Sequence, residues 1–238
     1  MADHAAHPPD TPRPGADVTL TRRAPRGAAV AAPGKDELEA GRLLFARECR
    51  FIHGAQTLDQ LPPLGPPELA FAGRSNVGKS SLLNALTGYE ALARVSRQPG
   101  RTRQLNFFDL GGRLRLVDMP GYGYAQAPKS VKADWQGTMF GYLRGRPSLK
   151  RVLLLLDARI ETKPADRAVM ELLDRAAVSF QLVLTKCDGL KPPALDAKLR
   201  EAATLARAHP AALHEVFATS SETRSGIPEL RAALAALA

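Results

Sequence analysis

Residues 73–80 read Gly-Arg-Ser-Asn-Val-Gly-Lys-Ser, a complete G-x-x-x-x-G-K-[ST] phosphate loop. An apolar run at 69–72 precedes the loop, and a helix-like run at 81–86 follows it. The motif requires this context, because a strand delivers the chain and the N-terminus of a helix faces the phosphates. In such a loop backbone N–H groups hold the α/β-phosphates, Lys79 reaches the β/γ oxygens and the Ser80 hydroxyl binds Mg²⁺. The sequence therefore predicts a nucleoside triphosphate site.

Composition limits what kind of protein this is. A chain of 238 residues could hold one α/β domain with extensions or two very small domains. Two cysteines, Cys49 and Cys187, are too few for a disulfide framework and suit a reducing compartment. The strongest apolar run, 152–156, stops at Asp157, and the N-terminus lacks the apolar core of a signal peptide. We expect a monomeric cytoplasmic protein that does not insert into a membrane.

The positive charge is unevenly distributed. The formal net charge is +9, yet residues 1–34 carry four arginines against three aspartates, so the excess lies on the folded part. Two stretches hold much of it, and they contain Arg94, Arg97, Arg101 and Arg103, and Lys129, Lys132, Arg144, Arg146, Lys150 and Arg151. These stretches predict a basic face that binds a polyanion, the alternative being an ordinary solvated surface.

The order of elements predicts the fold class. We expect a disordered tail at 1–34, an N-terminal helix and lead-in segment at 35–67, and the nucleotide-binding domain at 68–238. Strand-like runs lie at 68–72, 104–110, 113–118, 151–157, 179–185 and 214–218, and helix-like runs at 79–88, 129–143, 164–175, 195–208 and 227–237. Residues 105–118 read as a hairpin with a Gly-Gly turn, and later strands alternate with helices. The prediction is a three-layer α/β phosphate-loop NTPase with a mixed, mainly parallel six-stranded sheet and helices on both faces.

A second motif follows the strand-like run at 113–118. It reads Asp118-Met119-Pro120-Gly121, a D-x-x-G at a strand's C-terminal end, where ligands bind in open α/β sheets. Asp118 is expected to hold Mg²⁺ through a water, and the N–H of Gly121 to approach the γ-phosphate.

A third motif selects the base. Thr185-Lys186-Cys187-Asp188 is a [NT]-K-x-D at another strand end. The Asp188 carboxylate can accept hydrogen bonds from guanine N1–H and the exocyclic amine, neither of which adenine offers in that geometry. We expect Lys186 to lie over the base, and the backbone of a final loop to contact guanine O6 through Thr219, Ser220 and Ser221.

The switch segment lies between the first helix and the hairpin. Thr102 is the only threonine there, and it is expected to bind Mg²⁺ only when GTP is present. The residues assigned to nucleotide binding outside the second and third motifs are Gly73, Arg74, Ser75, Asn76, Val77, Gly78, Lys79, Ser80 and Ser81, together with Gly100, Arg101, Thr102, Arg103 and Gln104.

These motifs, in this order, resemble the translation-factor-related GTPases and, among them, the EngB (YihA/YsxC) family of bacterial ribosome-biogenesis GTPases. The matching segments are 71–81, 99–102 with 106–108, 117–125 and 184–188, and the resemblance covers roughly residues 45–238. The segment Pro-Gly-Tyr-Gly-Tyr-Ala at 120–125 is particularly diagnostic. Two features depart from the family pattern: the tail is longer than the core needs, and Ser221 replaces an alanine often found there.

The resemblance implies a Ras-like G domain that binds GTP or GDP with Mg²⁺. It also implies a role in assembly of the large ribosomal subunit, with the subunit or its precursor (rRNA and ribosomal proteins) as partner. The family is further associated with cell division and septation. One rival is a metabolic kinase or transferase, against which the T-K-x-D motif and the lack of a second substrate domain argue. Another rival is a septum-associated scaffold that holds GTP as a structural ligand.

Hydrolysis is expected to be slow. Ras-like enzymes position the attacking water with a Gln after D-x-x-G, whereas this chain has Tyr122. No catalytic side chain is assigned; Lys79, Thr102 and Asn76 are expected to support the transition state or K⁺. Asn76 occupies a position at which related GTPases ligate K⁺, and the alternative role is a local backbone cap within the loop.

Overall fold

A seven-stranded sheet forms the centre of the fold, with the strand order β1-β3-β4-β2-β5-β6-β7. This computed structural model describes residues 32–89, 92, 104–122 and 129–238, except for the side chains of 129–136. The strands are β1 (Cys49–Ala55), β2 (Glu68–Gly73), β3 (Leu105–Leu110), β4 (Leu114–Asp118), β5 (Leu149–Asp157), β6 (Phe180–Thr185) and β7 (Ala212–Ala218). The pairs β1–β3 and β3–β4 are antiparallel, and the other pairs are parallel. The predicted fold class is confirmed.

The predicted number of six strands is wrong, because β1 adds a seventh at the edge of the sheet. β1 pairs with β3, and their register shifts between Phe51 and His53. Such a bulge breaks the alternation of side chains that marks a half-buried strand in a sequence. The lead-in segment at 35–67 thus contributes a strand to the same sheet as the phosphate loop.

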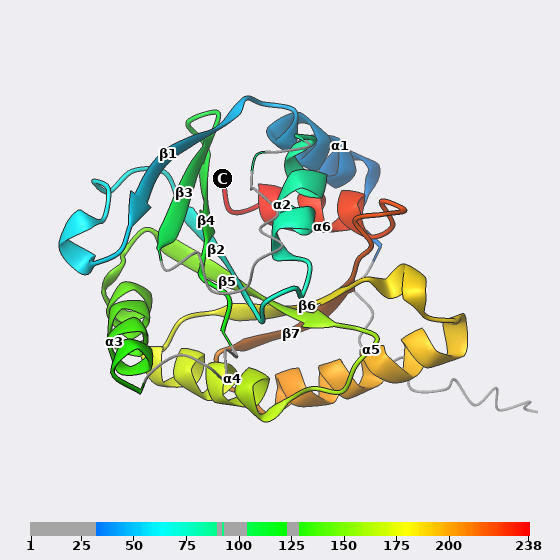
Figure 1. The fold of residues 1–238 in the computed structure, drawn as a ribbon. Helices are drawn as coiled ribbons and strands as arrows, with labels where there is room; N and C mark the ends of the chain where they lie inside the picture. The colour runs from blue at the N-terminus through cyan, green and yellow to red at the C-terminus, as the bar shows by residue number, and fades with distance from the viewer. Residues whose placement is uncertain (1–31, 90–91, 93–103, 123–128) are drawn as a thin grey trace, which may run out of the picture.

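Helices cover both faces of the sheet, as Figure 1 shows. The helices are α1 (Lys35–Phe45), α2 (Lys79–Thr87), α3 (Lys129–Gly145), α4 (Pro164–Ala176), α5 (Pro192–Arg207) and α6 (Ile227–Ala235), with short 3₁₀ turns η1 (Leu58–Gln60) and η2 (Cys187–Gly189). One layer consists of α1, α2 and α6 and the other of α3, α4 and α5. None of the helices in the described part of the chain combines the length and the apolar composition needed to span a lipid bilayer.

Burial on both faces explains why the central strands read as continuous apolar runs. In β2, Leu69 and Phe71 pack in the core beneath α2, while Ala70 and Ala72 belong to the core on the α3 side. A parallel strand covered by helices on both sides has no solvent face to be polar.

The predicted hairpin joins β3 to β4. Its turn residues Gly111 and Gly112 have φ angles of 55° and 67°. Positive φ at both central positions belongs to a type I′ turn, which fits the twist of the flanking strands and favours glycine. The hairpin delivers β4 beside β2, with Asp118 opposite Phe71 in the parallel register. The D-x-x-G motif therefore starts next to the strand that leads into the phosphate loop.

Candidate nucleotide-binding site

The phosphate loop connects β2 to α2. Its backbone turns through positive φ angles at Asn76 (62°) and Gly78 (108°), and Val77 N–H donates to the carbonyl of Arg74 at 3.2 Å. The N-terminus of α2 has no side-chain cap among the described residues, so first-turn N–H groups are left for a ligand. Ser80 and Ser81 lie in that first turn, directly behind Lys79. Such a helix end attracts an anionic group.

Lys79 and Asp118 come together across the mouth of the loop. The ammonium of Lys79 forms an ion pair with Oδ1 of Asp118, at the end of β4. The two side chains are 12% and 9% exposed, so both are held in place. Asp118 and Ser80 offer only oxygen donors, which is the chemistry that Mg²⁺ prefers.

The D-x-x-G turn lies directly against the phosphate loop. Tyr122 N–H donates to the carbonyl of Gly73 at 3.2 Å, and Ser75 N–H donates to that of Tyr122 at 3.3 Å. A Cβ on Gly121 would lie 2.8 Å from Ser75 Oγ and 3.1 Å from its nitrogen. Glycine therefore permits this close approach without displacing Ser75. Met119 and Pro120 are buried, and Met119 N–H donates to the carbonyl of Phe71 at 3.1 Å.

Tyr122 is turned into the core. Its side chain is buried, and its hydroxyl donates to Asp166 Oδ1 of α4 at 2.9 Å. Burial first, and then the Asp166 carboxylate, raise the pKa of the phenol. The other oxygen of Asp166 accepts from Lys163 N–H at 2.8 Å. Tyr122 is thus used to join the D-x-x-G turn to α4.

The T-K-x-D motif is bonded to the phosphate loop. Thr185 Oγ1 donates to the carbonyl of Val77 at 2.6 Å, and Lys186 Nζ donates to that of Asn76, also at 2.6 Å. Lys186 has a φ of 58°, a left-handed conformation that carries its side chain across the loop. The motifs expected to hold phosphate and base therefore form one connected unit.

Asp188 stands at the surface, supported by the final loop. Ser220 Oγ donates to Asp188 Oδ1 at 2.5 Å, and Ser220 is fully buried. The N–H groups of Thr219 and Ser220 donate to the carbonyls of Leu184 and Ser225. Ser221 N–H makes no backbone hydrogen bond within the part of the chain that the structure describes. Of the three amides expected at guanine O6, that of Ser221 is the one left available.

One further residue of this edge was missed in the sequence. Asp157, the last residue of β5, accepts hydrogen bonds from Lys186 Nζ at 2.9 Å and from Arg159 Nη2 at 2.9 Å. Burial opposes ionisation of Asp157, but these hydrogen bonds outweigh it and lower its pKa to about 2. The available signal was its place at the end of a parallel strand beside β2 and β6. Cys187 is buried, which raises its pKa to about 11 and keeps the thiol protonated at neutral pH.

Most of the switch segment lies outside the residues that the structure describes. Gly100, Arg101, Thr102 and Arg103 lie outside the described residues, as do Arg94 and Arg97. Gln104 is described, and its Nε2 donates to Asn106 Oδ1 at 2.9 Å.

A strand, loop and helix that form a phosphate site, with D-x-x-G and T-K-x-D motifs at the same sheet edge, define a phosphate-loop GTPase. The family described as 50S ribosome-binding GTPase matches residues 68–186. The probable GTP-binding protein EngB of Granulibacter bethesdensis is 67% identical over 207 residues, covering 87% of this chain and 93% of that protein. Its counterpart in Gluconobacter oxydans is 66% identical over 206 residues, covering 87% and 91%. The chain belongs to the EngB family of GTP-binding proteins, and it is a GTPase.

Solved structures share the fold. The crystal structure of a probable GTP-binding protein engB matches with a TM-score of 0.55 and 23% identity, covering 71% of this chain and 97% of that one. Era in complex with MgGDPNP and nucleotides 1506–1542 of 16S ribosomal RNA matches with a TM-score of 0.57 and 20% identity, covering 74% and 57%.

Proposed function

We propose that this GTPase acts as a Mg²⁺-dependent switch in assembly of the large ribosomal subunit, in the cytoplasm. The observation that carries the nucleotide part is the connection of Asp188 to Ser220 at one end of the site and of Lys79 to Asp118 at the other. The assembly part is supported by the description of the matching family, a 50S ribosome-binding GTPase.

In the proposed complex, Asp188 accepts hydrogen bonds from guanine N1–H and the exocyclic amine. Ser221 N–H donates to O6, and Lys186 lies over the base. Lys79 and the first turn of α2 hold the phosphates. Ser80 binds Mg²⁺ directly and Asp118 through a water, and the ion neutralises charge on the phosphate oxygens. Thr102 completes the metal site in the GTP state only.

Slow hydrolysis fits the position of Tyr122, because a buried phenol bonded to Asp166 does not orient a water. Asn76 remains the candidate for K⁺. Its side chain is exposed and makes no hydrogen bond among the described residues, which favours the cation role over a local backbone cap. Turnover in KCl is expected to exceed turnover in NaCl at equal ionic strength, and the Asn76→Ala variant should lose that difference. Equal rates in the two salts would remove K⁺ from the proposal.

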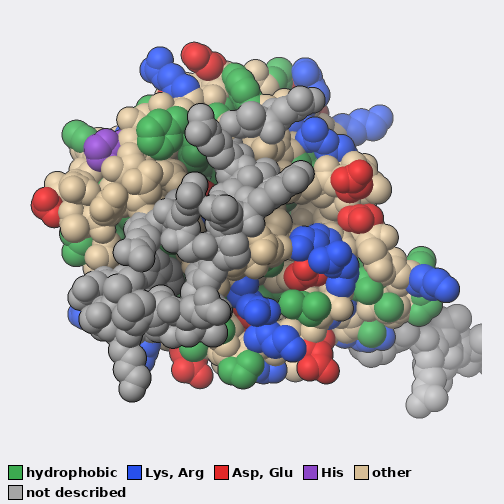
Figure 2. Space-filling view, viewed as in Figure 1, with side chains coloured by type: hydrophobic (Ala, Val, Ile, Leu, Met, Phe, Trp, Pro, Cys, Tyr) green, Lys and Arg blue, Asp and Glu red, His purple; other side chains and the backbone are tan. Residues whose placement is uncertain are grey.

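The proposed contact with the particle is basic, but not all of the predicted residues are available for it. Arg146 is buried on Glu68, and Arg151 is half-buried and bonded to Gln181, whereas Arg144 and Lys150 are exposed. Figure 2 shows Lys and Arg side chains interspersed with Asp and Glu on the face in view. We therefore propose that the stretch with Arg94 and Arg97 supplies much of the contact.

Co-sedimentation with purified ribosomal subunits tests the role. The proposal expects binding to the large subunit or its precursor with a GTP analogue, and release with GDP. The Lys79→Ala variant, unable to hold phosphate, should bind equally weakly under both conditions. A protein that does not co-sediment in any nucleotide state, or whose binding is insensitive to salt, would instead be the septum-associated scaffold.

A further inference from the structure

A second pocket lies at the opposite end of β2 from the phosphate loop. It has a volume of about 440 Å³, and its walls are Ile52 and His53 of β1, the segment 60–64 and Arg115 of β4. Arg115 pairs in register with Glu68, the first residue of β2, and the phosphate loop begins at its last residue. Six residues of strand separate the two places by about 17 Å. The pocket is therefore distinct from the nucleotide site.

Arg115 contributes an incompletely satisfied guanidinium to this pocket. Its side chain is 10% exposed, and its Nη1 donates to the carbonyl of Pro63 at 3.0 Å and to Glu68 Oε1 at 3.2 Å. Within the described residues, Nε is buried without a partner and Nη2 donates to no acceptor. A buried N–H group without an acceptor costs free energy, and a charged one attracts an anion.

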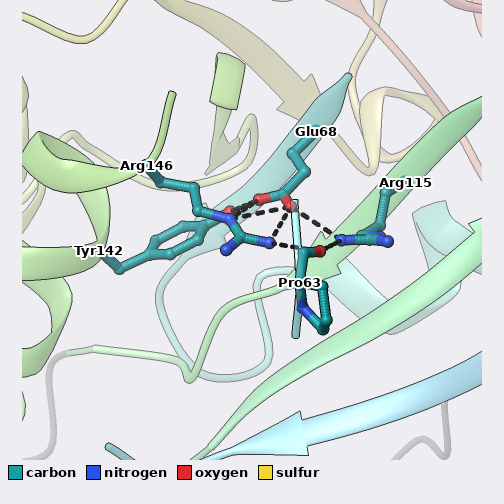
Figure 3. Close-up of polar contacts among 5 residues, drawn as sticks. All are labelled: Pro63, Glu68, Arg115, Tyr142 and Arg146. Carbon is teal, nitrogen blue, oxygen red and sulfur yellow. Dashed lines mark hydrogen bonds and ion pairs between the residues drawn. The ribbon is translucent and has the colours of Figure 1, made fainter. Parts of the chain in front are cut away.

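The surroundings do not neutralise Arg115. Arg146 reaches Glu68 from the other side, with its Nη2 2.6 Å from Oε1, as Figure 3 shows. The Tyr142 hydroxyl donates to Oε2 at 3.1 Å. Burial first, and then Glu68, raise the pKa of Tyr142, so the phenol carries no charge. Two guanidinium groups thus share one carboxylate.

Charged residues on the neighbouring strands do not remove the excess positive charge around Glu68. Asp109 of β3 is opposite Arg115 in register, but its carboxylate accepts from Gly112 N–H at 2.9 Å. Arg50 of β1 is opposite Asp109 in turn. The group contains three arginines (Arg50, Arg115 and Arg146) and two acidic residues (Glu68 and Asp109). It therefore carries an excess of one positive charge.

The rim of the pocket is apolar and exposed. Ile52 and Leu64, which line it, are 37% and 61% exposed. Within the described residues β1 pairs with β3 alone, so its other edge has free backbone groups. A protein segment can bind such an edge through its backbone while its side chains enter adjacent pockets. Aliphatic and prolyl walls favour a protein segment over an RNA phosphate.

We propose that this pocket docks a segment of a partner protein in which a carboxylate lies next to an apolar side chain. The carboxylate accepts a charge-assisted hydrogen bond from Nη2 of Arg115, since Nε is buried. The apolar neighbour packs on Ile52 and Leu64. This inference does not depend on the proposed ribosomal role.

NMR titration of the full chain tests the proposal with two peptides, acetyl-Leu-Glu-Leu-Glu-Leu-amide and its Gln counterpart. The Glu peptide should shift the Arg115 Nε–H resonance and the amides of 52–64 saturably, and the Gln peptide should bind at least tenfold more weakly. Gly65→Ala is the most specific variant, because its Cβ would lie 2.7 Å from Arg115 Nη2 and cover that nitrogen. It should weaken the Glu peptide at least fivefold, as should Arg115→Lys. Arg113→Ala, which removes a charge from the exposed β3–β4 turn, should change the affinity less than twofold.

Several results would overturn the proposal. They are the absence of saturable shifts, equal affinity for the Glu and Gln peptides, the same shifts with sodium acetate at equal concentration, and displacement of the peptide by lower concentrations of oligouridylate. Pocket resonances that shift with protein concentration alone would assign the pocket to a second copy of the chain and contradict it too. Unchanged GDP affinity in Gly65→Ala and Arg115→Lys would show that these variants fold.

Discussion

The buried Ser220 hydroxyl holds the exposed Asp188 carboxylate, which is expected to read the base. Ser220→Ala removes a hydrogen bond to a charged acceptor, worth about 1.5 kcal/mol, so GDP affinity should fall roughly tenfold. Competition with a fluorescent GDP analogue measures this loss. Ser221→Ala is the matched control, because the expected contact of Ser221 is through its backbone N–H. Inosine diphosphate lacks the exocyclic amine, so Ser220→Ala should reduce the affinity for it less than the affinity for GDP. Equal losses of GDP affinity in Ser220→Ala and Ser221→Ala would contradict the assignment of Asp188 as the base-reading residue.

Asp157 should make stability depend on pH in the acid range. Its pKa is lowered to about 2 in the folded protein, from about 3.9 in an unfolded chain. A lowered pKa means that ionised Asp157 stabilises the fold above about pH 4, and that this contribution is lost as pH falls toward 2. The difference in free energy of unfolding between the protein and Asp157→Asn should therefore be constant above about pH 5 and shrink below about pH 4. Urea unfolding at successive pH values measures it. A difference that persists unchanged to pH 2 would exclude the ion pairs with Lys186 and Arg159 as its source.

At the residue scale, the sequence identifies the type of site better than the contacts within it. The T-K-x-D motif predicts Asp188 as the base-reading residue, because its four residues are consecutive and can be recognised in the sequence alone. The hydrogen bond from Ser220 links loops 32 residues apart, and that from Lys186 to Asn76 links residues 110 apart. Pairing over such separations is decided by the packing of the strands, which no local pattern contains.

Three elements meet at Glu68, and that residue should control their stability together. Its carboxylate joins β2 to Arg115 of β4, to Tyr142 of α3 and to Arg146 directly after that helix, and it is fully buried. Removing the charge from a buried ion pair costs about 3–5 kcal/mol, because the partners are left uncompensated. Glu68→Gln should therefore unfold at markedly lower urea concentration and leave GDP affinity of the folded protein unchanged.

The control for this prediction is Glu39→Gln. Glu39 pairs with Arg42 on the surface of α1, where both side chains are more than half exposed. Exposed pairs contribute little, so this variant should unfold like the unmodified protein. A Glu68→Gln variant as stable as the control would mean that the buried network contributes specificity rather than stability.

At the element scale, strands that lie between helices are predictable and the edge strand is not. β5 and β6 read as apolar runs because both faces are buried. β1 contains Arg50, His53 and Gly54, and it is a strand because β3 supplies its hydrogen bonds. Glu68 is similar, since a charged residue is tolerated at full burial only because Arg115 and Arg146 arrive from other elements.

At the scale of the whole molecule, the fold brings the motifs to one edge of the sheet, whereas the net positive charge is a separate property of the surface. A parallel sheet places the C-terminal ends of β2, β4, β5 and β6 side by side, so motifs spread over residues 73–188 form one site. The fold class follows from the sequence for that reason. Net charge is a property of the surface and does not determine fold, so it predicts a kind of partner and a salt dependence.

That salt dependence gives a test at the scale of the whole molecule. Each arginine–phosphate contact contributes about 0.7–0.9 to the slope of log affinity against log salt. Replacing Arg94 and Arg97 by Ala should lower the slope for binding to ribosomal particles by about 1.5, with nucleotide affinity unchanged. Arg175→Ala with Arg207→Ala removes the same charge from exposed positions on α4 and α5 and should leave the slope nearly unaltered. Co-sedimentation across a series of KCl concentrations measures both. If the two double variants reduce the slope equally, net charge alone governs binding, and the stretch around Arg94 and Arg97 is not the contact.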